Sequence, residues 1–283
     1  MHSTGTLFVV ATPIGNLGDI TFRAIEVLKS VDLIAAEGVN RTRALCRHYG
    51  INTAIRRFNQ HNQKRRLPEL LSLLNSGGQV ALVTNAGTPG ISDPGAFFVS
   101  KALAEGIKVT PVPGASAVTA ALSVAGIGAE RFLFLGFLPS KQGARRKELE
   151  RWRDVGVPIV IYEAPHRITE TLTDVLEVLD DPVVVLLREL TKVHEEVTRG
   201  RASEILRSLA NKEVRGEFVL VLETQAPSKI ELDRDVIQKI SQVATKTNRS
   251  IKDIAREVST ETGIPFRKIY KIVLEMRRRS DQS

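Results

Sequence analysis

Residues 80–95 constrain the fold of this chain more than any other segment. The apolar run 80–83 is typical of a buried strand, and the loop after it consists largely of glycine, proline and short polar residues. A helix is expected to begin near Ala96. A strand, a glycine-rich loop and a helix in this order place a ligand at the carboxyl end of a parallel sheet. The glycines let the backbone approach a ligand closely and the prolines hold that backbone in shape, although a rigid structural turn is the alternative.

Two more loops of this kind follow strands. Residues 13–18 come after the apolar run 6–11, and residues 113–117 come after the run 108–112. None of the three loops contains the Gly-Lys-Ser or Gly-Lys-Thr of a phosphate loop, and none matches the dinucleotide-binding fingerprint. A ligand with little phosphate and many polar edges, held mainly by backbone groups, fits better. S-adenosylmethionine is such a ligand, although the loops alone do not name it.

Strands and helices alternate along the first part of the chain, which predicts an α/β fold with a mostly parallel sheet covered by helices. After Gly128 the pattern changes, and we expect a second α/β domain, for which a mixed sheet is an option. The expected strands are 6–11, 31–36, 80–83, 108–112, 131–136, 158–163, 183–188 and 217–223. The expected helices are 21–29 with Thr21 as N-cap, 42–49, 66–76, 97–105, 145–155, 167–179 and 202–210.

The chain is expected to have three parts. These are an N-terminal α/β domain over residues 1–114, a second α/β domain over 115–225 and a helical module over 226–283. Residues 225–228 have the composition of a linker.

The helical module shows no strand pattern. Helical spacing is present at 236–243, at 250–258 with Ser250 as cap, and in the basic segment 266–279, and a turn with glycine and proline separates the last two. A short helix, a turn and a basic helix are typical of a helix-turn-helix. A small helical lid or a dimer element is an equally good interpretation.

The charge of the chain favours a polyanionic partner. The chain has 40 lysines and arginines against 32 aspartates and glutamates, which gives a net charge of +8. The basic residues gather at 41–66, 141–147 and 277–279. One such cluster is often only a solvated face, but three together favour nucleic acid.

The single cysteine, Cys46, excludes an internal disulfide and a site with several thiolate ligands, and no metal is expected. No apolar run approaches the ~18 residues of a membrane span, and the first residues lack the pattern of a signal peptide. We therefore expect a cytoplasmic protein without a membrane partner.

Six motifs follow one another along the chain, at residues 12–21, 86–95, 112–114, 162–167, 188–192 and 216–221. With these motifs, nearly the whole chain resembles the small-subunit ribosomal RNA methyltransferases of the tetrapyrrole methylase fold. The resemblance implies two α/β domains of the tetrapyrrole methylase type, with a cofactor cleft between them. It also implies a homodimer that methylates the ribose 2′-oxygen of a cytidine in small-subunit ribosomal RNA or a 30S-type particle, with S-adenosylmethionine as cofactor.

The resemblance and the chemistry together give the expected site residues. The sulfonium is already an activated leaving group, so positioning supplies most of the rate, but the ribose hydroxyl is a poor nucleophile that a base or a cation would assist. The expected catalytic residues are Glu163, His166, Glu189 and Lys192. The expected cofactor contacts are Pro13, Gly15, Asn85, Gly87, Thr88, Ile91, Pro113, Gly114, Ser116, Ala117, Tyr162, Leu190, Gly216 and Glu217. The expected RNA contacts are Arg41, Arg43, Arg56, Arg57 and Arg167.

Some positions depart from the pattern of the resembled family, and each departure removes a charge or a titratable group. These positions are Gly38, Asn40, Asn59, Gln63 and Asn85. The amide of Asn85 still forms hydrogen bonds but cannot act as a base. A cofactor- and RNA-binding homologue with impaired catalysis is therefore a second interpretation. A tetrapyrrole methylase that acts on a small macrocycle is a third.

Overall fold

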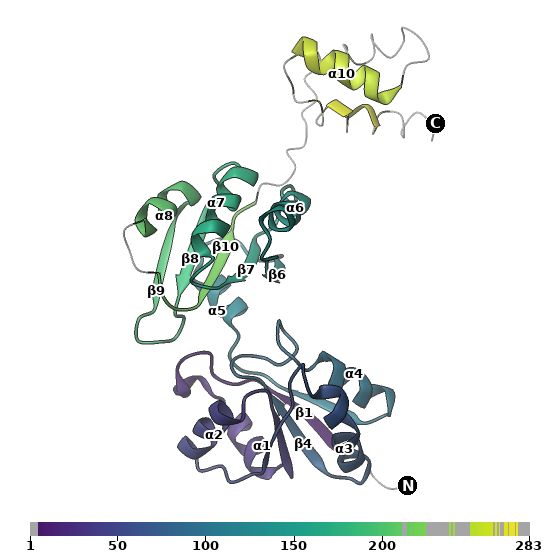
Figure 1. Cartoon of the computed structure of the whole chain (residues 1–283), viewed down its shortest axis with the longest axis vertical. Coiled ribbons are helices and arrows are strands. Elements are labelled where there is room, and N and C mark those ends of the chain that lie inside the picture. The colour runs from purple at the N-terminus through teal and green to yellow at the C-terminus, as the bar shows by residue number, and fades with distance from the viewer. Residues whose placement is uncertain are drawn as a thin grey trace. The chain divides into compact units, whose positions relative to one another are not determined.

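The structure is a computed structural model. It describes residues 5–210, 214–224, 238, 240, 250–262, 264, 266, 269–270, 272–274 and 276. The chain divides into two compact units, residues 1–225 and 226–283. Within the first unit the strands form two separate sheets of five strands each (Figure 1). The expected linker at 225–228 lies outside the described residues, and the expected boundary after residue 114 stays a prediction.

The first sheet is entirely parallel, as the alternation of strands and helices predicts. Its strand order is β3-β2-β4-β1-β5, and each neighbouring pair runs parallel. The three-residue strand β3 was not expected from the sequence, because two of its residues are arginines and the run is too short to show a period. The strands are β1 (Thr6–Val10), β2 (Leu33–Ala36), β3 (Ile55–Arg57), β4 (Gln79–Val83) and β5 (Lys108–Val112).

Helices cover both faces of the first sheet, because successive strand residues point to opposite sides. In β4, Val80 and Leu82 pack with the residues of α3 and α4, whereas Ala81 and Val83 pack with those of α1 and α2. The Oγ1 of Thr21 accepts a hydrogen bond from the N–H of Ala24 at 3.1 Å, which confirms the expected N-cap. The helices are the 3-10 turn η1 (Leu17–Asp19), α1 (Phe22–Ser30), α2 (Val39–His48), α3 (Gln63–Asn75) and α4 (Ala96–Ala104).

The second sheet is mixed, which was the option left open by the sequence. Its order is β6-β7-β10-β8-β9, with a parallel pair β6-β7 and antiparallel pairs elsewhere. Strand β9, with the sequence EVTRGR, was not expected, because this exposed edge strand carries almost no apolar pattern. The strands are β6 (Leu133–Phe137), β7 (Ile159–Glu163), β8 (Val183–Arg188), β9 (Glu196–Arg201) and β10 (Phe218–Leu222).

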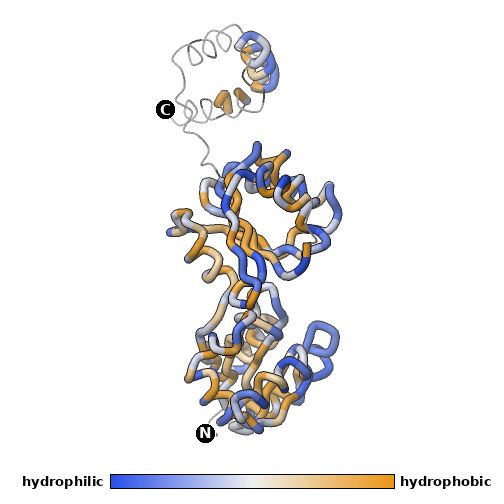
Figure 2. Tube along the Cα trace, turned by 90° about the vertical axis from the view of Figure 1, so that its left-hand side faces the viewer, coloured by the Kyte–Doolittle hydropathy of each residue, from blue (hydrophilic) through white to orange (hydrophobic). Residues whose placement is uncertain are grey.

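Three helices pack on one face of the second sheet and one packs on the other. Apolar residues of α6, α7 and α8 form one core with the sheet, and α5 forms the other. The strands are the apolar centre of this arrangement, and the hydrophilic residues lie mainly on the helices and loops around them (Figure 2). The helices are α5 (Ala117–Val124), α6 (Gln142–Trp152), α7 (Ile168–Val178) and α8 (Ala202–Leu209).

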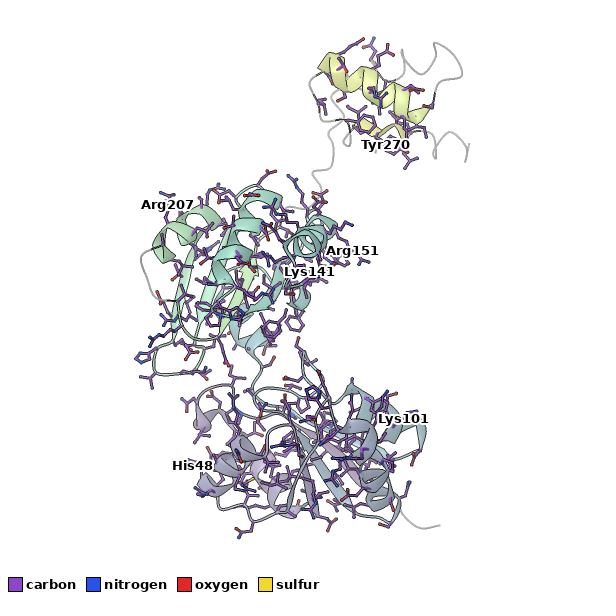
Figure 3. The ribbon with its side chains drawn as sticks, viewed as in Figure 1. His48, Lys101, Lys141, Arg151, Arg207 and Tyr270 are labelled. Atoms are coloured by element: carbon purple, nitrogen blue, oxygen red, sulfur yellow. The ribbon has the colours of Figure 1, made fainter. Side chains whose placement is uncertain are left out.

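A buried ion pair joins α6 to α7. The side chains of Arg145 and Asp174 are 1% and 0% exposed, and Arg145 Nε lies 2.6 Å from Asp174 Oδ2. Arg146 Nε lies 2.6 Å from the other oxygen. Burial alone would raise the pKa of Asp174, but the hydrogen bonds from Arg146 and Arg145 lower it below its usual value. Part of the second basic cluster is therefore structural, whereas Lys141 and Arg151 at the two ends of α6 face outward (Figure 3).

We expect Asp174→Ala to destabilise the first unit by about 3–5 kcal/mol, because the substitution leaves the buried guanidinium of Arg145 without its partner. Thermal and urea unfolding would measure the loss. Glu177→Ala is the matched control, since it removes an exposed partner of Arg146 from the same helix and should cost at most about 1 kcal/mol. Equal losses in the two variants would contradict the structural role of the buried pair.

In the second unit, α10 (Ile251–Thr262) is the described helix. The Oγ of Ser250 accepts a hydrogen bond from the N–H of Asp253 at 3.3 Å, which confirms this residue as the cap. Ile254 and Val258 pack with Ile269 and neighbouring apolar residues. Of the expected helix at 236–243 only residues 238 and 240 are described, and parts of the segment 266–279 lie outside the described residues, so the helix-turn-helix stays a prediction. In the part of the chain that the structure describes, no helix is long and apolar enough to cross a membrane.

Candidate functional site

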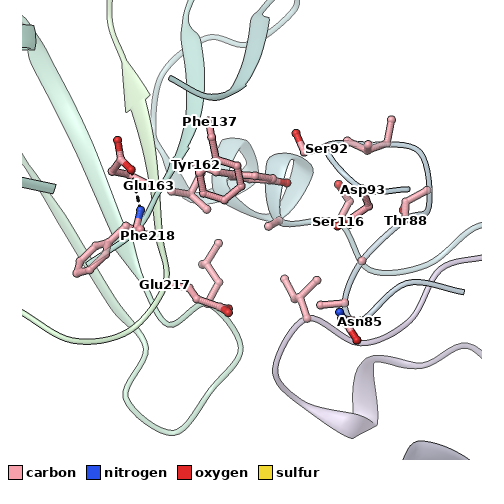
Figure 4. A pocket seen from close by; sticks show the side chains of 18 of the residues that line it. Asn85, Thr88, Ser92, Asp93, Ser116, Phe137, Tyr162, Glu163, Glu217 and Phe218 are labelled. Carbon is pink, nitrogen blue, oxygen red and sulfur yellow. Dashed lines mark hydrogen bonds between the residues drawn. The ribbon is translucent and has the colours of Figure 1, made fainter. Parts of the chain in front are cut away.

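A cavity of ≈ 390 Å³ lies where loops at the carboxyl ends of β1, β2 and β4 face the start of α5 and one end of the second sheet (Figure 4). This is the position expected for a ligand of a parallel sheet. The volume lies in the range of small-molecule sites. The cavity is lined by Ile14, Glu37, Arg41, Asn85, Ala86, Gly87, Thr88, Ile91, Ser92, Asp93, Ser116, Ala117, Phe137, Tyr162, Glu163, Ala164, Pro165, Leu190, Glu217, Phe218 and Val219.

Most of the expected cofactor contacts come together in this cavity. Those that line it are Asn85, Gly87, Thr88, Ile91, Ser116, Ala117, Tyr162, Leu190 and Glu217. They come from five separate segments of the chain, which the fold brings to one place. The expected contacts that do not line it are Pro13, Gly15, Pro113, Gly114 and Gly216. A direct role of each residue in cofactor binding stays a prediction.

Two of the glycines outside the cavity allow neighbouring loops to pack closely. A Cβ on Gly15 would lie 2.5 Å from Cγ of Lys192 and 2.9 Å from the carbonyl oxygen of Leu190. The next residue, Asn16, donates its N–H to Oγ1 of Thr191 at 3.1 Å. Gly216 has a φ of +100°, and a Cβ there would lie 2.6 Å from Cγ of Glu189. These contacts fix the loop after β1 and the start of β10 against the loop after β8.

The loop 84–95 is fixed at two positions, Gly87 and Ser92. Gly87, with a φ of +74°, exchanges two backbone hydrogen bonds of 2.9 Å with Thr12. Ser92 has a φ of +59°, which is unusual for a residue other than glycine. Ser92 packs against the β-bulge of β6 at Gly136. A Cβ on Gly136 would lie 2.7 Å from Oγ of Ser92, so only glycine leaves room for this contact. Unusual backbone conformations of this kind gather at functional sites.

The expected catalytic residue Glu163 is held by its neighbours. Its side chain is 0% exposed, and Oε2 accepts a hydrogen bond from Oγ1 of Thr171 at 2.6 Å. Oε1 accepts from the N–H of Ala164 at 2.8 Å and lies 3.3 Å from Nε of Arg167. The residue lines the cavity, but its carboxylate connects β7 to α7. This geometry favours a positioning role over proton transfer.

The expected catalytic residues Glu189 and Lys192 form an ion cluster with Glu217. Lys192 Nζ lies 2.8 Å from Glu189 Oε1 and 3.0 Å from Glu217 Oε2. Burial would raise the pKa of Glu189, but the hydrogen bonds from Lys192 and from the N–H of Glu217 lower it. Burial likewise opposes the charge of Lys192, but the hydrogen bonds to both carboxylates raise its pKa. Lys192 therefore stays protonated at neutral pH. The fourth expected catalytic residue, His166, is exposed and does not line the cavity.

The aromatic side chains of Tyr162 and Phe137 form an apolar wall of the cavity (Figure 4). Their ring centroids are 5.7 Å apart in an edge-to-face arrangement. Burial, and then the charge of Asp93, raise the pKa of Tyr162 to about 12, so this phenol stays neutral. The wall can hold a flat aromatic group by stacking or a sulfonium cation by a cation–π contact.

Two acidic residues of the cavity, Glu37 and Asp93, were not recognised from the sequence. Burial, and then the charge of Glu37, raise the pKa of Asp93 to about 6. A sequence signal was present, because Asp93 is the one carboxylate in the loop 84–95. Glu37 follows the buried strand β2 directly, which is the position where parallel sheets place ligand-binding groups.

The expected RNA contacts fall into three groups. Arg41 lines the cavity and also a smaller one of ≈ 240 Å³ beside it. Arg43, Arg56 and Arg57 are exposed on α2 and β3. Arg167 is 17% exposed, and its Nη2 donates to the carbonyl oxygen of Leu138 at 2.8 Å. Of the five expected RNA contacts, Arg41, Arg43, Arg56 and Arg57 form no such internal bond with the described residues.

Two of the departing positions are in contact. A Cβ on Gly38 would lie 2.1 Å from Oδ1 of Asn85, so the asparagine side chain occupies the place that a larger residue 38 would need. The N–H of Asn85 donates to Oε2 of Glu37 at 3.0 Å. A third departing residue, Asn59, has a local structural role, because its Oδ1 accepts from the N–H of His61 at 3.1 Å at the entry to α3. The changes at 38 and 85 therefore form one coupled feature.

We expect Gly38→Ala to destabilise the fold, and Asn85→Ala to relieve most of that loss in the double variant. The coupling free energy between contacting residues is about 0.5–3 kcal/mol. A double-mutant cycle measured by urea unfolding would give it. Gly128→Ala is the control, because a Cβ there meets nothing within 4 Å. Additive effects of the two substitutions would show that the side chain of Asn85 does not depend on Gly38.

Comparisons with known proteins agree with this architecture. A family model for Tetrapyrrole (Corrin/Porphyrin) Methylases matches residues 6–206. The protein named Ribosomal RNA small subunit methyltransferase I from Halalkalibacterium halodurans is 40% identical over 274 residues, which cover 95% of this chain and 94% of that relative. The protein of the same name from Streptococcus pyogenes serotype M1 is 43% identical over 260 residues, which cover 90% and 91%.

Solved structures share the fold at lower identity. A diphthine synthase matches with a TM-score of 0.63 and 16% identity, over 78% of this chain and 90% of that one. The uroporphyrin-III C-methyl transferase from Thermus thermophilus, complexed with S-adenyl homocysteine, matches with a TM-score of 0.56 and 19% identity, over 77% and 97%.

The chain therefore belongs to the tetrapyrrole methylase family, and the expected fold class is confirmed. Within that family it belongs with the ribosomal RNA small subunit methyltransferases I, which match it over nearly its whole length.

Proposed function

We propose that this chain methylates the ribose 2′-oxygen of a cytidine in small-subunit ribosomal RNA. Methyl transfer to small-subunit ribosomal RNA and the use of S-adenosylmethionine follow from the family. The ribose oxygen and the cytidine come from the sequence resemblance. The observation that carries the proposal is the cavity at the carboxyl ends of β1, β2 and β4, with acidic groups inside and exposed arginines on α2 and β3.

The side chains of the cavity fit S-adenosylmethionine, which carries a sulfonium and an ammonium group. The carboxylates of Glu37 and Glu217 in the lining would attract these cationic groups, and Arg41 is the one cation among the described residues of the lining. An acidic, partly buried cavity favours a cationic ligand. When bound, the cofactor supplies an activated methyl group. The wall of Phe137 and Tyr162 would hold an aromatic ring, and the backbone at Gly87 would hold polar edges.

In this proposal, the residues expected to be catalytic act mainly by positioning. Glu163 and Arg167 fix the end of β7, while Lys192 joins the carboxylates of Glu189 and Glu217 beside the cavity. Holding two reactants in line contributes much of the rate when the leaving group is already activated. The substrate hydroxyl and the methyl donor would meet between the end of β7 and the ion cluster of Lys192.

The backbone at Gly87 provides the first test of the proposal. We expect Gly87→Val to weaken S-adenosylhomocysteine binding at least tenfold in calorimetry, because the branched side chain would enter the cavity and strain a φ of +74°. Gly106→Val is the matched control. Its φ is +71°, but a Cβ there meets nothing within 4 Å and the residue does not line the cavity. Equal loss of binding in both variants would assign the effect to backbone strain alone.

The reaction itself is tested by single-turnover methylation of small-subunit particles, followed by mass mapping of ribose methylation. One new 2′-O-methylcytidine is expected with the wild type, and at sub-saturating S-adenosylmethionine it should form at least about tenfold more slowly with Gly87→Val. Binding of S-adenosylhomocysteine and RNA without methyl transfer would instead support the interpretation as a homologue with impaired catalysis. The loss of charge at the contacting positions Gly38 and Asn85 is the observation behind that interpretation. Methylation of a porphyrin-type macrocycle would support the third interpretation.

The exposed arginines are proposed to bind the RNA backbone. We expect the double substitution of Arg56 and Arg57 by alanine to weaken RNA binding and to reduce the slope of log K against log salt by about 2, because each arginine neutralises about one phosphate. Lys101→Ala, on the outside of α4, is the control and should change the slope by less than about 0.5. An unchanged slope in the double variant would remove β3 from the RNA-binding surface.

A homodimer and a cytoplasmic location belong to the same proposal. The homodimer rests on the sequence resemblance, and the cytoplasmic location on the single cysteine. Sedimentation equilibrium of the full chain would test the oligomeric state. A concentration-independent monomer would contradict the homodimer without affecting the proposed reaction.

A further inference from the structure

The cavity holds one carboxylate that the structure leaves unpaired. Glu37 is engaged, because its Oε2 accepts the N–H of Asn85 at 3.0 Å. Glu217 is engaged with Lys192 at 3.0 Å. Among the described residues, none gives Asp93 a hydrogen bond or an ion pair, although its side chain is half-buried in the lining. An acceptor kept free inside a ligand cavity is available to a group of the ligand.

The loop that carries Asp93 is built to hold it in this position. Ser92, the residue before it, has a positive φ and sits against the bulge at Gly136. Gly95, two residues later, has a φ of +147°, and a Cβ there would lie 3.1 Å from Leu82. The backbone on both sides of Asp93 is therefore fixed by conformations that few residues adopt. The carboxylate lies near Ser116 and toward the hydroxyl of Tyr162 (Figure 4).

The charged groups around Asp93 set its basicity. Glu37 acts on it from the end of β2 and Tyr162 lies beside it on β7, while Arg41 of α2 and Glu217 at the start of β10 line the same cavity. Burial and the charge of Glu37 raise the pKa of Asp93 to about 6, and no ion pair lowers it. A carboxylate with a pKa just below neutral pH is mostly ionised and still accepts a proton readily, which suits general base catalysis.

The residues expected from the sequence to assist the hydroxyl are less suited. Glu163 is buried against α7, Glu189 and Lys192 are paired with each other, and His166 lies outside the cavity. We propose that Asp93 is the general base that removes the proton from the substrate hydroxyl in this cavity. The inference rests on the proposed function, and it assigns a catalytic role to a residue outside the expected set.

The proposed step involves only the substrate hydroxyl, the methyl donor, Asp93 and water. The O–H bond of the ribose hydroxyl breaks and its proton moves to a carboxylate oxygen of Asp93. The oxygen's electron pair forms the new bond to the methyl carbon, while the pair of the broken carbon–sulfur bond remains on sulfur as a neutral thioether. Asp93 then gives the proton to water, so no other co-reactant is needed.

The first experiment is the pH dependence of single-turnover methylation at saturating S-adenosylmethionine and small-subunit particles. In the wild type the rate should fall tenfold per pH unit below about 6, because Asp93 becomes protonated. Asp93→Asn should be at least about 100-fold slower at pH 8 and should lose this dependence. Asp154→Asn, which changes an exposed aspartate away from the cavity, should match the wild type in both respects.

A second experiment measures Asp93 without catalysis. Because its folded-state pKa lies above the ordinary value of 3.8, ionisation above pH 6 costs stability that protonation restores below pH 4. Asp93→Asn should therefore have a higher Tm than the wild type at pH 8, and the difference should shrink between about pH 6 and pH 4. Its affinity for S-adenosylhomocysteine in calorimetry should stay within about threefold of the wild type, since the hydroxyl proton is its target.

Each contrary result has a distinct meaning. An Asp93→Asn variant with wild-type rate and pH profile overturns the inference and leaves the proposed function intact. A variant that loses S-adenosylhomocysteine affinity as strongly as activity shows instead that Asp93 holds the cofactor, which also overturns it. A wild type that does not methylate the particles overturns the proposed function, and the inference with it.

Discussion

Close packing between backbone segments, made possible by glycines, is the constraint on which the site depends. Gly15 brings the loop after β1 against Leu190 and Lys192, and Gly136 makes room for Ser92. At each place a Cβ would come within 3 Å of a neighbouring atom, so any larger residue would push the two segments apart. The acidic groups from the first sheet and the aromatic wall from the second can therefore face one cavity.

The fold could be predicted well from local patterns. Apolar runs ended by glycine-rich loops identified β1, β4 and β5, and the parallel first sheet followed from the alternation with helices. Strands β3 and β9 were not predicted. A three-residue strand with two arginines and an exposed edge strand do not bury enough apolar surface to give a periodic hydrophobic pattern. The same physical reason limits any argument that reads strands from hydrophobicity alone.

The site could be predicted in its location but less well in its chemistry. Motif positions gave loops that do line the cavity, such as those of Gly87 and Tyr162. The sequence does not show which charged groups are paired, since the hydrogen bond from Thr171 to Glu163 and the ion pair of Arg167 with Glu163 depend on how α7 packs against β7. It also does not show that Gly38 and Asn85 share one space, because they are 47 positions apart and meet only through the pairing of β2 with β4.

The topology of the second sheet has a consequence for the folding of the chain during its synthesis on the ribosome. The first sheet is complete once β5 has been made, and N-terminal domains generally fold first during synthesis. Strand β10 is the last strand of the second sheet in the sequence, yet it lies between β7 and β8 and pairs with both. Until it is inserted, β7 and β8 lack a common neighbour and the cavity lacks the wall formed by Glu217, Phe218 and Val219. A nascent chain can thus fold its first half early, but it acquires a ligand site only when its final strand has arrived.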